Sequence, residues 1–318
     1  MALAQATWDD YAVDKIVGHF FLNTPFTPTT SLWLALGTNA VTASLTGEPV
    51  GNNYARVEIL GATGRDFTVA SLVDDLGRIE NANTWFFNRA NGGDWGTMQT
   101  LNIMDAVSGG NRIAVADLGI GGQAIIQGEA YQINNGDLYF QNRLPDVSLA
   151  LSELCLTGAG HALFCNLVLR GDTTAPPDTN IWLGLLDNDG DTQAGREAPY
   201  TNGSESEPTN GGYARIEVGN DSPITTIGLT ATTTTPGAHG FEIDVGDLNF
   251  PSATATYTNN VWFLGFFQES TGGVMLGFAP LHDGSNAAAL VSAPGIVVAK
   301  NNFVQVDDSG TQYQVIIS

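Results

Sequence analysis

A short motif that occurs twice limits what this chain can fold into. Residues 52–59 read Asn-Asn-Tyr-Ala-Arg-Val-Glu-Ile, and residues 211–218 read Gly-Gly-Tyr-Ala-Arg-Ile-Glu-Val. Two further blocks stand in the same order in each half: residues 32–36 and 101–110 in the first, residues 181–185 and 264–273 in the second. Three blocks in one order indicate a tandem duplication, and longer loops in the second copy explain the changing distance between matching blocks.

The length and the repeat together predict two domains. A chain of 318 residues is long enough for about two domains, each with its own apolar core. Apolar residues make up 43% of the chain, which is typical of a globular protein and not of a disordered one. We place the boundary near residues 144–147, so that the first copy spans residues 1–145 and the second spans residues 146–318.

Each copy reads as one helix followed by about seven or eight short strands. Apolar residues at helical spacing predict a helix over residues 8–21, with Thr7 as its N-cap. A second helix is expected over residues 149–169, interrupted at Gly158 and Gly160. The strands alternate with glycine-rich turns. This pattern predicts a mainly β protein with two tandem β-sandwich or jelly-roll-like domains, each led by a short α-helix.

The charge of the chain argues against two classes of partner. Its net charge is −22, from 33 acidic and 11 basic residues, so nucleic acid and anionic membranes should repel it. No apolar run is long enough to span a membrane, and the first ten residues do not resemble a signal peptide. We expect Cys155 and Cys165 to be buried thiols, because nothing in the sequence suggests a disulfide framework.

Residue patterns typical of catalysis are missing from the sequence. The four histidines form no ligand-spaced cluster, and the common nucleophile, phosphate-binding and zinc-protease motifs do not occur. The sequence therefore predicts neither an enzyme nor a cofactor. The best metal candidate is the run Asp187, Asp189 and Asp191, whose carboxylates could bind Ca²⁺. Because the glycine and glutamate of an EF-hand loop are not in place, we expect an acidic solvated turn instead.

Arginine is scarce, yet each copy keeps one between a tyrosine and a glutamate. The two sets are Tyr54, Arg56 and Glu58 in the first copy, and Tyr213, Arg215 and Glu217 in the second. Side chains two residues apart share one face of a strand, so we expect each arginine to pair with the glutamate that follows it. The alternative is that each arginine anchors a neighbouring subunit.

Exposed aromatic side chains could bind sugar, and three tryptophans are candidates for such a role. They are Trp85, Trp95 and Trp262. Large aromatic side chains also dominate protein cores, and burial is the outcome that we expect for all three.

The blocks can be compared with known proteins. The first copy contains Gly47-Glu48, Tyr54-Ala55-Arg56, Trp95-Gly96 and Asp105-Ala106 followed by Gly109-Gly110. The second contains Gly195-Arg196-Glu197, Tyr213-Ala214-Arg215 and Gly272-Gly273, with Thr258-Asn259 in place of the Trp-Gly pair. This order resembles a family of tailed-bacteriophage virion proteins, described either as capsid decoration (cement) proteins or as tail fibre proteins. The resemblance covers nearly the whole chain and implies a structural component of the virion.

Two functions follow from this resemblance. The first expectation is a capsid decoration protein that binds the major capsid protein, or other virion proteins, and stabilises the head lattice. The alternative is a tail fibre or baseplate component that contacts the host surface or a glycan, although the sequence shows neither elongated repeats nor a trimerisation stem. Either role implies a homo-oligomer such as a trimer, made in the host cytoplasm and placed on the outer surface of the particle.

Overall fold

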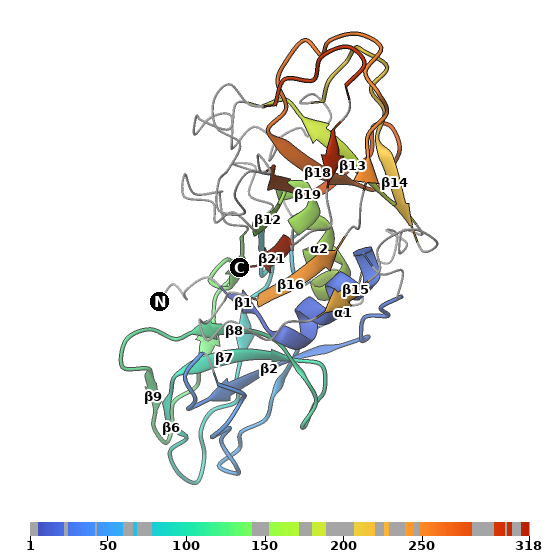
Figure 1. Cartoon of the computed structure of the whole chain (residues 1–318). Helices are drawn as coiled ribbons and strands as arrows, with labels where there is room; N and C mark the ends of the chain where they lie inside the picture. The colour runs from blue at the N-terminus through green and yellow to red at the C-terminus, as the bar shows by residue number, and fades with distance from the viewer. Residues whose placement is uncertain are drawn as a thin grey trace.

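A computed structural model gives the fold of most of the chain. It describes residues 6–21, 25–41, 43–59, 66–68, 78–141, 153–171, 180–188, 207–219, 226–228, 239–244, 248–281, 296–302, 304–306 and 313–317. The protein is mainly β, with several antiparallel sheets and one short helix near the start of each half (Figure 1). This arrangement is consistent with the expected β-sandwich-like domains.

The first half is built on a five-stranded antiparallel sheet with the order β1-β8-β7-β2-β3. Its elements are β1 (Thr7–Trp8), α1 (Asp10–Phe21), β2 (Leu32–Gly37), β3 (Val57–Ile59), β7 (Thr100–Met104) and β8 (Arg112–Asp117). Three two-stranded sheets complete this half. They pair β4 (Ile79–Glu80) with β11 (Tyr139–Phe140), β5 (Trp85–Phe86) with β10 (Gln132–Ile133), and β6 (Gly96–Met98) with β9 (Gln123–Ile125).

The second half is built on an eight-stranded sheet with the order β14-β13-β18-β19-β12-β21-β16-β15. Its first elements are β12 (Glu153–Leu156), α2 (Gly158–Arg170), β13 (Asn180–Leu186), β14 (Ile216–Gly219), β18 (Phe263–Phe267) and β19 (Met275–Pro280). The other strands are β15 (Thr226–Gly228), β16 (His239–Asp244) and β21 (Tyr313–Ile317). A separate pair joins β17 (Leu248–Asn249) to β20 (Gln305–Val306).

Five strands and one helix have the same topology in both halves. The order β1-β8-β7-β2-β3 of the first sheet corresponds to β12-β19-β18-β13-β14 in the second, and the helix follows the first of these strands each time. Registers agree as well, because Met104 pairs with Arg112 as Phe267 pairs with Met275. Shared topology is what a tandem duplication predicts. Residues 142–152 lie outside the described part of the chain, so the division at residues 145 and 146 stays a prediction.

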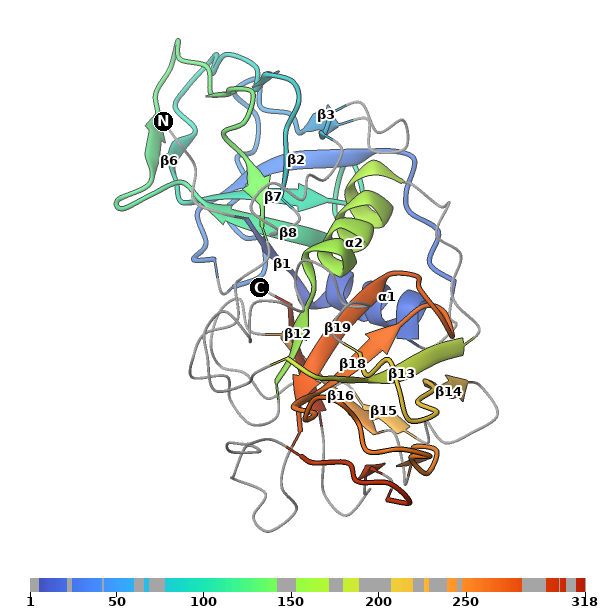
Figure 2. The same ribbon diagram turned by 90° about the horizontal axis from the view of Figure 1, so that it is seen from above.

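The two helices lie next to each other between the two large sheets (Figures 1 and 2). The rings of Phe20 on α1 and Phe164 on α2 are 4.8 Å apart, and both side chains are fully buried. A second link between the halves runs from Arg170 Nη1, which donates to the carbonyl oxygen of Phe67 at 2.6 Å. Buried apolar residues of both halves therefore form one continuous core.

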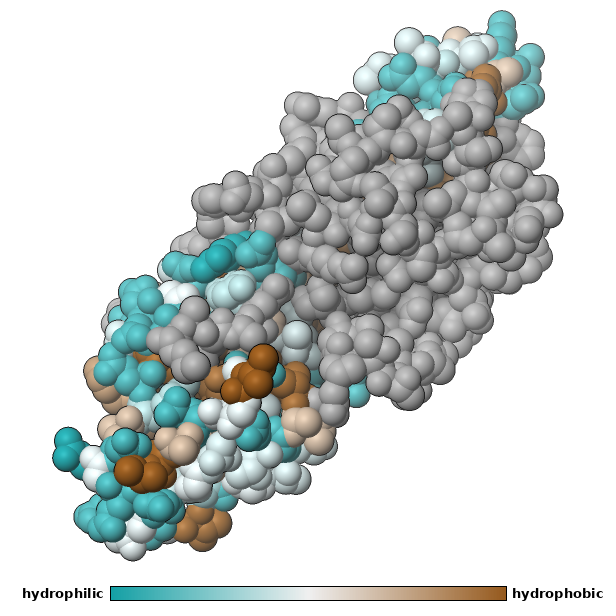
Figure 3. Space-filling view, turned by 90° about the vertical axis from the view of Figure 1, so that its left-hand side faces the viewer, coloured by the Kyte–Doolittle hydropathy of each residue, from teal (hydrophilic) through white to brown (hydrophobic). Residues whose placement is uncertain are grey.

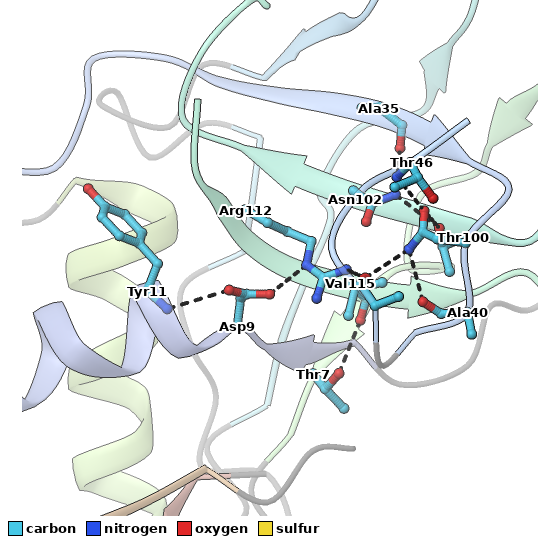
Figure 4. Close-up of polar contacts among 12 residues, drawn as sticks. Thr7, Asp9, Tyr11, Ala35, Ala40, Thr46, Thr100, Asn102, Arg112 and Val115 are labelled. Carbon is cyan, nitrogen blue, oxygen red and sulfur yellow. Dashed lines mark hydrogen bonds and ion pairs between the residues drawn. The ribbon is translucent and has the colours of Figure 1, made fainter. Parts of the chain in front are cut away.

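The start of the first helix differs from the prediction. Thr7 and Trp8 form β1 and pair with β8, so the predicted start at residue 8 and the predicted Thr7 cap are wrong. Asp9 precedes the helix instead, and its carboxylate accepts from the backbone N–H of Tyr11 at 3.4 Å (Figure 4). Trp8 is buried and its backbone pairs with Ala114 of β8, so tertiary pairing and not helical periodicity sets its conformation.

The second helix is also shorter than predicted, because residues 153–156 form β12. Thr157 is the N-cap, and its hydroxyl accepts from the N–H of Gly160 at 2.9 Å. The two glycines expected to interrupt the helix therefore lie in its first turn. Cys155 lies on β12 and Cys165 on α2, where Cys165 is a free, buried thiol. Burial raises the pKa of this thiol.

Close packing explains the glycine at position 160. A Cβ atom added there would lie 2.1 Å from the carbonyl oxygen of Leu276 on β19, far inside van der Waals contact. Thr157 strengthens the same contact, since its hydroxyl donates to the carbonyl oxygen of Met275. Helix α2 thus approaches β19 at a distance that only glycine permits.

Replacing Gly160 tests this close approach. Gly160→Ala should destabilise the protein by about 1–3 kcal/mol through overpacking, although alanine ordinarily favours a helix by up to about 1 kcal/mol. Thermal unfolding followed by circular dichroism measures the change, and Ala159→Gly at the neighbouring position serves as the control for backbone freedom alone. A Gly160→Ala variant more stable than the parent would show that α2 can move away from β19 at no cost.

Candidate functional site

The Tyr-Ala-Arg motif of the first half forms a cluster with a glutamate from the preceding loop. Arg56 donates from Nε and Nη2 to the two carboxylate oxygens of Glu48, each at 2.8 Å. The hydroxyl of Tyr54 donates to Glu48 Oε1 at 3.0 Å and accepts from the N–H of Leu36 at 2.9 Å. We call Glu48, Tyr54 and Arg56 the first cluster.

The second half repeats this arrangement with Glu207, Tyr213 and Arg215, which we call the second cluster. Arg215 Nε lies 2.9 Å from Glu207 Oε1, and Nη2 lies 2.5 Å from Oε2. The Tyr213 hydroxyl donates to Glu207 at 2.5 Å and accepts from the N–H of Leu185 at 2.8 Å. The guanidinium also stacks 3.4 Å from the ring centre of Phe267, a favourable cation–π contact.

Each arginine also holds the hairpin turn that carries two adjacent glycines. Arg56 Nη1 donates to the carbonyl oxygens of Ala106 and Gly109, at 2.7 and 2.8 Å. In the second half, Arg215 Nη1 donates to those of Glu269 and Gly272, at 2.6 and 2.7 Å. One guanidinium therefore joins a loop, the start of an edge strand and a turn.

These turns require glycine for a backbone reason. Gly109 and Gly110 have φ values of 58° and 78°, and Gly272 and Gly273 have values of 63° and 69°. Two successive residues in the left-handed region are disfavoured for most amino acids, with asparagine the main exception, as at Asn52 and Asn53. A Cβ at Gly110 would also lie 2.4 Å from Asp105 Oδ1. The Gly-Gly repeat of the sequence is thus a conformational requirement of the turn.

The glutamate predicted to pair with each arginine was the wrong one. Glu58 accepts instead from the Ser31 hydroxyl at 2.6 Å, and Glu217 is exposed. Strands β3 and β14 begin one residue after Arg56 and Arg215, so neither arginine lies on the strand face that the alternation implied. Both side chains point inward and are only 5% and 3% exposed. They bind within the chain and are not free to anchor a neighbouring subunit through their guanidinium groups.

A signal for the correct glutamates is present in the sequence. Glu48 and Glu207 each stand six residues before the motif tyrosine, and each is followed by proline. The sequence comparison matched Gly47-Glu48 to residues 195–197, whereas the structure gives the role of Glu48 to Glu207. Tyr54 and Tyr213 are 159 residues apart, and the same spacing applied to Glu48 leads to Glu207.

The aromatic neighbours of the two tyrosines differ between the halves. Trp95 packs edge-on against Tyr54, with ring centres 5.1 Å apart, and its indole N–H donates to the carbonyl oxygen of Asn52 at 3.0 Å. In the second half, Tyr257 takes this place against Tyr213 at 6.0 Å. The replacement accounts for the missing Trp-Gly pair in the second copy.

All three tryptophans considered as sugar-binding candidates are buried. Trp85, Trp95 and Trp262 are 5%, 7% and 8% exposed, which confirms the expected core role. In the coloured part of the face drawn in Figure 3, apolar side chains lie among polar ones. Exposed apolar side chains of this kind are common on soluble proteins.

The described residues contain no group of three or more histidine, cysteine, aspartate or glutamate side chains that could hold a metal. Asp187 accepts from Asn259 Nδ2 at 2.8 Å, and partial burial raises its pKa. Asp189 and Asp191 lie outside the described residues. His19 accepts through Nδ1 from the N–H of Phe26 at 3.1 Å, which is a structural role.

One open polar cleft lies beside the first cluster. It has a volume of about 490 Å³, and its lining includes Asp9, Tyr11, Glu48, Arg56 and Arg112. Arg112 Nε donates to Asp9 Oδ2 at 2.5 Å, and this ion pair links β8 to the start of α1 (Figure 4). Two guanidinium groups and two carboxylates therefore line the same cleft.

Removing an arginine should affect the two clusters unequally. Arg215→Met leaves the carboxylate of Glu207, which is 10% exposed, without its partner, and we expect a loss of about 3–5 kcal/mol in unfolding free energy. Arg56→Met should cost less, because Glu48 is 26% exposed and water can solvate it. Calorimetric unfolding of the full chain compares the two, with Arg215→Met/Glu207→Gln expected to recover part of the loss. Equal losses for both arginines would contradict this account.

The buried tyrosines predict a loss of stability in alkali. Burial, reinforced by the neighbouring glutamate, raises the pKa values of Tyr54 and Tyr213, and burial raises that of Tyr131 to about 12. Above a pH of about 10, unfolded tyrosines release protons that the folded protein retains, so stability must fall as pH rises.

The double variant Tyr54→Phe/Tyr213→Phe should flatten this alkaline slope, although it also costs about 1–3 kcal/mol near neutral pH for each unpaired backbone N–H. Unfolding midpoints measured across the alkaline range test the slope. The chain has only two lysines, Lys15 and Lys300, to titrate in the same range. An unchanged slope in the double variant would mean that other groups control alkaline stability.

No helix within the described residues is long and apolar enough to cross a membrane.

The comparison with known proteins agrees with the duplicated structure. A search of curated proteins found no match. The family described as "Podophage GP4 fiber I protein gp80" matches twice, over residues 7–141 and 159–289, which together make up most of the chain. The chain therefore belongs to this family of phage virion structural proteins, whose characteristic region it carries twice in tandem.

Proposed function

We propose that this protein is a structural component of a phage fibre. The observation that carries the proposal is the family match, which covers both halves and describes a fibre protein. The sequence had first suggested a capsid decoration protein, with a tail fibre as the alternative. The family description favours the alternative, and nothing in the two clusters or the cleft favours binding to a head lattice.

The fold supports a mechanical role for the protein. Each cluster ties a loop, an edge strand and a hairpin turn through one guanidinium, so that three separate segments move together. Helices α1 and α2 join the two halves through a shared core, which limits motion between them. A rigid double module of this kind suits a component that holds its place between other virion proteins.

The role that we propose is not catalytic. The motif residues that the two copies share are occupied with each other or with backbone carbonyls, which is a structural use of their polar atoms. The partners that we propose are other virion proteins and further copies of this chain, with the protein on the outer surface of the particle. Its net charge of −22 makes nucleic acid and anionic membranes poor partners.

The position of the protein in the particle tests the proposal. Gold-labelled antibodies against the purified protein, applied to intact virions and viewed by electron microscopy, should mark the fibres. Antibodies against the major capsid protein provide the control for access to the head. Gold label confined to the head would contradict the fibre assignment and support the capsid decoration role instead.

A further inference from the structure

Four asparagines of this chain are each followed directly by glycine, a pair of residues that can lose ammonia without any enzyme. In this reaction the backbone nitrogen of the glycine attacks the side-chain amide carbon of the asparagine, and glycine allows the approach because it has no side chain. The structure describes three of the four pairs, all except that at Asn202. The four asparagines are Asn91, Asn135, Asn202 and Asn210.

The pair at Asn135 is held by hydrogen bonds at both reacting groups. Asn135 Nδ2 donates to the carbonyl oxygen of Ala82 at 2.6 Å. The attacking nitrogen belongs to Gly136, and its N–H donates to the carbonyl oxygen of Asn81 at 2.9 Å. Both hydrogen bonds must break before the ring can close, so the fold protects this pair.

The pair at Asn210 is held through its side chain. Asn210 Nδ2 donates to the carbonyl oxygen of Thr256 at 3.0 Å, and Oδ1 accepts from the N–H of Thr258 at 3.2 Å. The glycine of this pair is also closely packed, because a Cβ atom added to Gly211 would lie 2.5 Å from the carbonyl oxygen of Ala255. Neither partner of the reaction can turn toward the other without breaking these contacts.

The pair at Asn91 has none of these restraints on its reacting groups. Both Asn91 and Gly92 are exposed. In the part of the chain that the structure describes, neither the Asn91 side chain nor the N–H of Gly92 makes a hydrogen bond. The space around Gly92 is open as well, since an added Cβ atom would meet only Asn52 Oδ1, at 3.5 Å.

The second half forms the same backbone contact with other residues. The N–H of Asn91 donates to the carbonyl oxygen of Asn52 at 2.9 Å, and the N–H of Thr254 donates to that of Gly211 at 2.7 Å. Asn52 and Gly211 are 159 residues apart, as are the two motif tyrosines. Thr254 therefore takes the place of Asn91, and the contact itself does not require asparagine.

We propose that Asn91 is a deamidation site and that in the folded protein it reacts ahead of Asn135 and Asn210. A base from solvent removes the N–H proton of Gly92, and the nitrogen then bonds to Cγ of Asn91. The Cγ–Nδ2 bond breaks, and Nδ2 takes up a proton and leaves as ammonia. Water opens the cyclic imide at either of its carbonyl carbons, which gives aspartate or isoaspartate. No oxidation or reduction takes place.

The isoaspartate product acts on the surroundings of the first cluster. In this product the main chain runs through Cβ, which adds one carbon atom to the backbone at position 91. The segment is fixed on both sides by Asn52, whose carbonyl oxygen accepts from Asn91 and whose Nδ2 donates to the carbonyl oxygen of Asp94 at 3.1 Å. The same Asn52 carbonyl oxygen accepts from the indole of Trp95, which packs on Tyr54. A longer backbone therefore strains the contact that supports Tyr54.

Mass spectrometry of stored protein tests the site. The purified full chain is kept in warm, mildly alkaline buffer and digested with trypsin, and a fresh sample digested in parallel gives the background. The three asparagines fall in different peptides, residues 90–112, 113–143 and 197–215, and fragmentation identifies the converted residue. Asn91 should convert about tenfold or more faster than Asn135 and Asn210, because those two must first break hydrogen bonds.

Two controls separate the effect of the fold from that of the sequence. In concentrated urea all three pairs should convert at similar rates. The variant Asn91→Gln should remain unconverted at position 91, because glutamine forms the larger ring more slowly. Storage should lower the unfolding midpoint of the parent and leave that of the variant higher.

The site would be wrong if Asn135 or Asn210 converted as fast as Asn91 in the folded protein, or if Asn91 reacted only in urea. Equal loss of the unfolding midpoint in the stored parent and in stored Asn91→Gln would contradict the effect on the first cluster. The reaction does not depend on where the protein lies in the particle.

Discussion

The fold of each half depends on one buried arginine and the carboxylate that it faces. A guanidinium presents several N–H donors in a fixed plane, and here two edges of that plane serve two purposes. One edge holds a glutamate, and the other holds the carbonyl oxygens of a glycine turn. Three segments of the chain meet at the guanidinium, so replacing the arginine by an uncharged residue would release a loop, an edge strand and a hairpin turn together. This explains why the Tyr-Ala-Arg motif is the most clearly repeated part of the sequence.

Much of the fold could be read from the sequence because local signals and burial agree. The short strands, the glycine-rich turns between them and one helix near the start of each half agree with the sequence patterns. Errors occurred at helix starts, where residues 7–8 and 153–156 extend a sheet before the helix begins. Tertiary contacts set the conformation of these residues. Trp8 is buried and pairs with β8, and helix propensity is too weak to override such contacts. Periodicity within a short window contains no information about such contacts.

The clusters were predicted only in part for a related reason. The strand pattern identified Tyr54, Arg56 and their second-half counterparts, yet it assigned each arginine the glutamate two residues later. That inference assumed that the strand includes the arginine, whereas β3 and β14 begin just after it. The polar cleft had no sequence signal at all. Asp9 and Arg112 lie about a hundred residues apart, and only the pairing of β1 with β8 brings them together.

The position of β21 within the second sheet affects how the chain acquires its structure during synthesis. This strand, the last that the structure describes, lies between β12 and β16 and pairs with both. Strands β15 and β16 emerge from the ribosome well before β21, yet they can join the main sheet only through it. The five-stranded sheet of the first half needs no residue beyond Asp117, so it can form while the second half is still being made. The second sheet cannot be completed until β21 has been made. The pairing of β12 with β21 joins residues far apart in the sequence, which slows the formation of the sheet. A nascent chain that stalls before β21 would therefore carry one finished sheet and one with an unpaired edge.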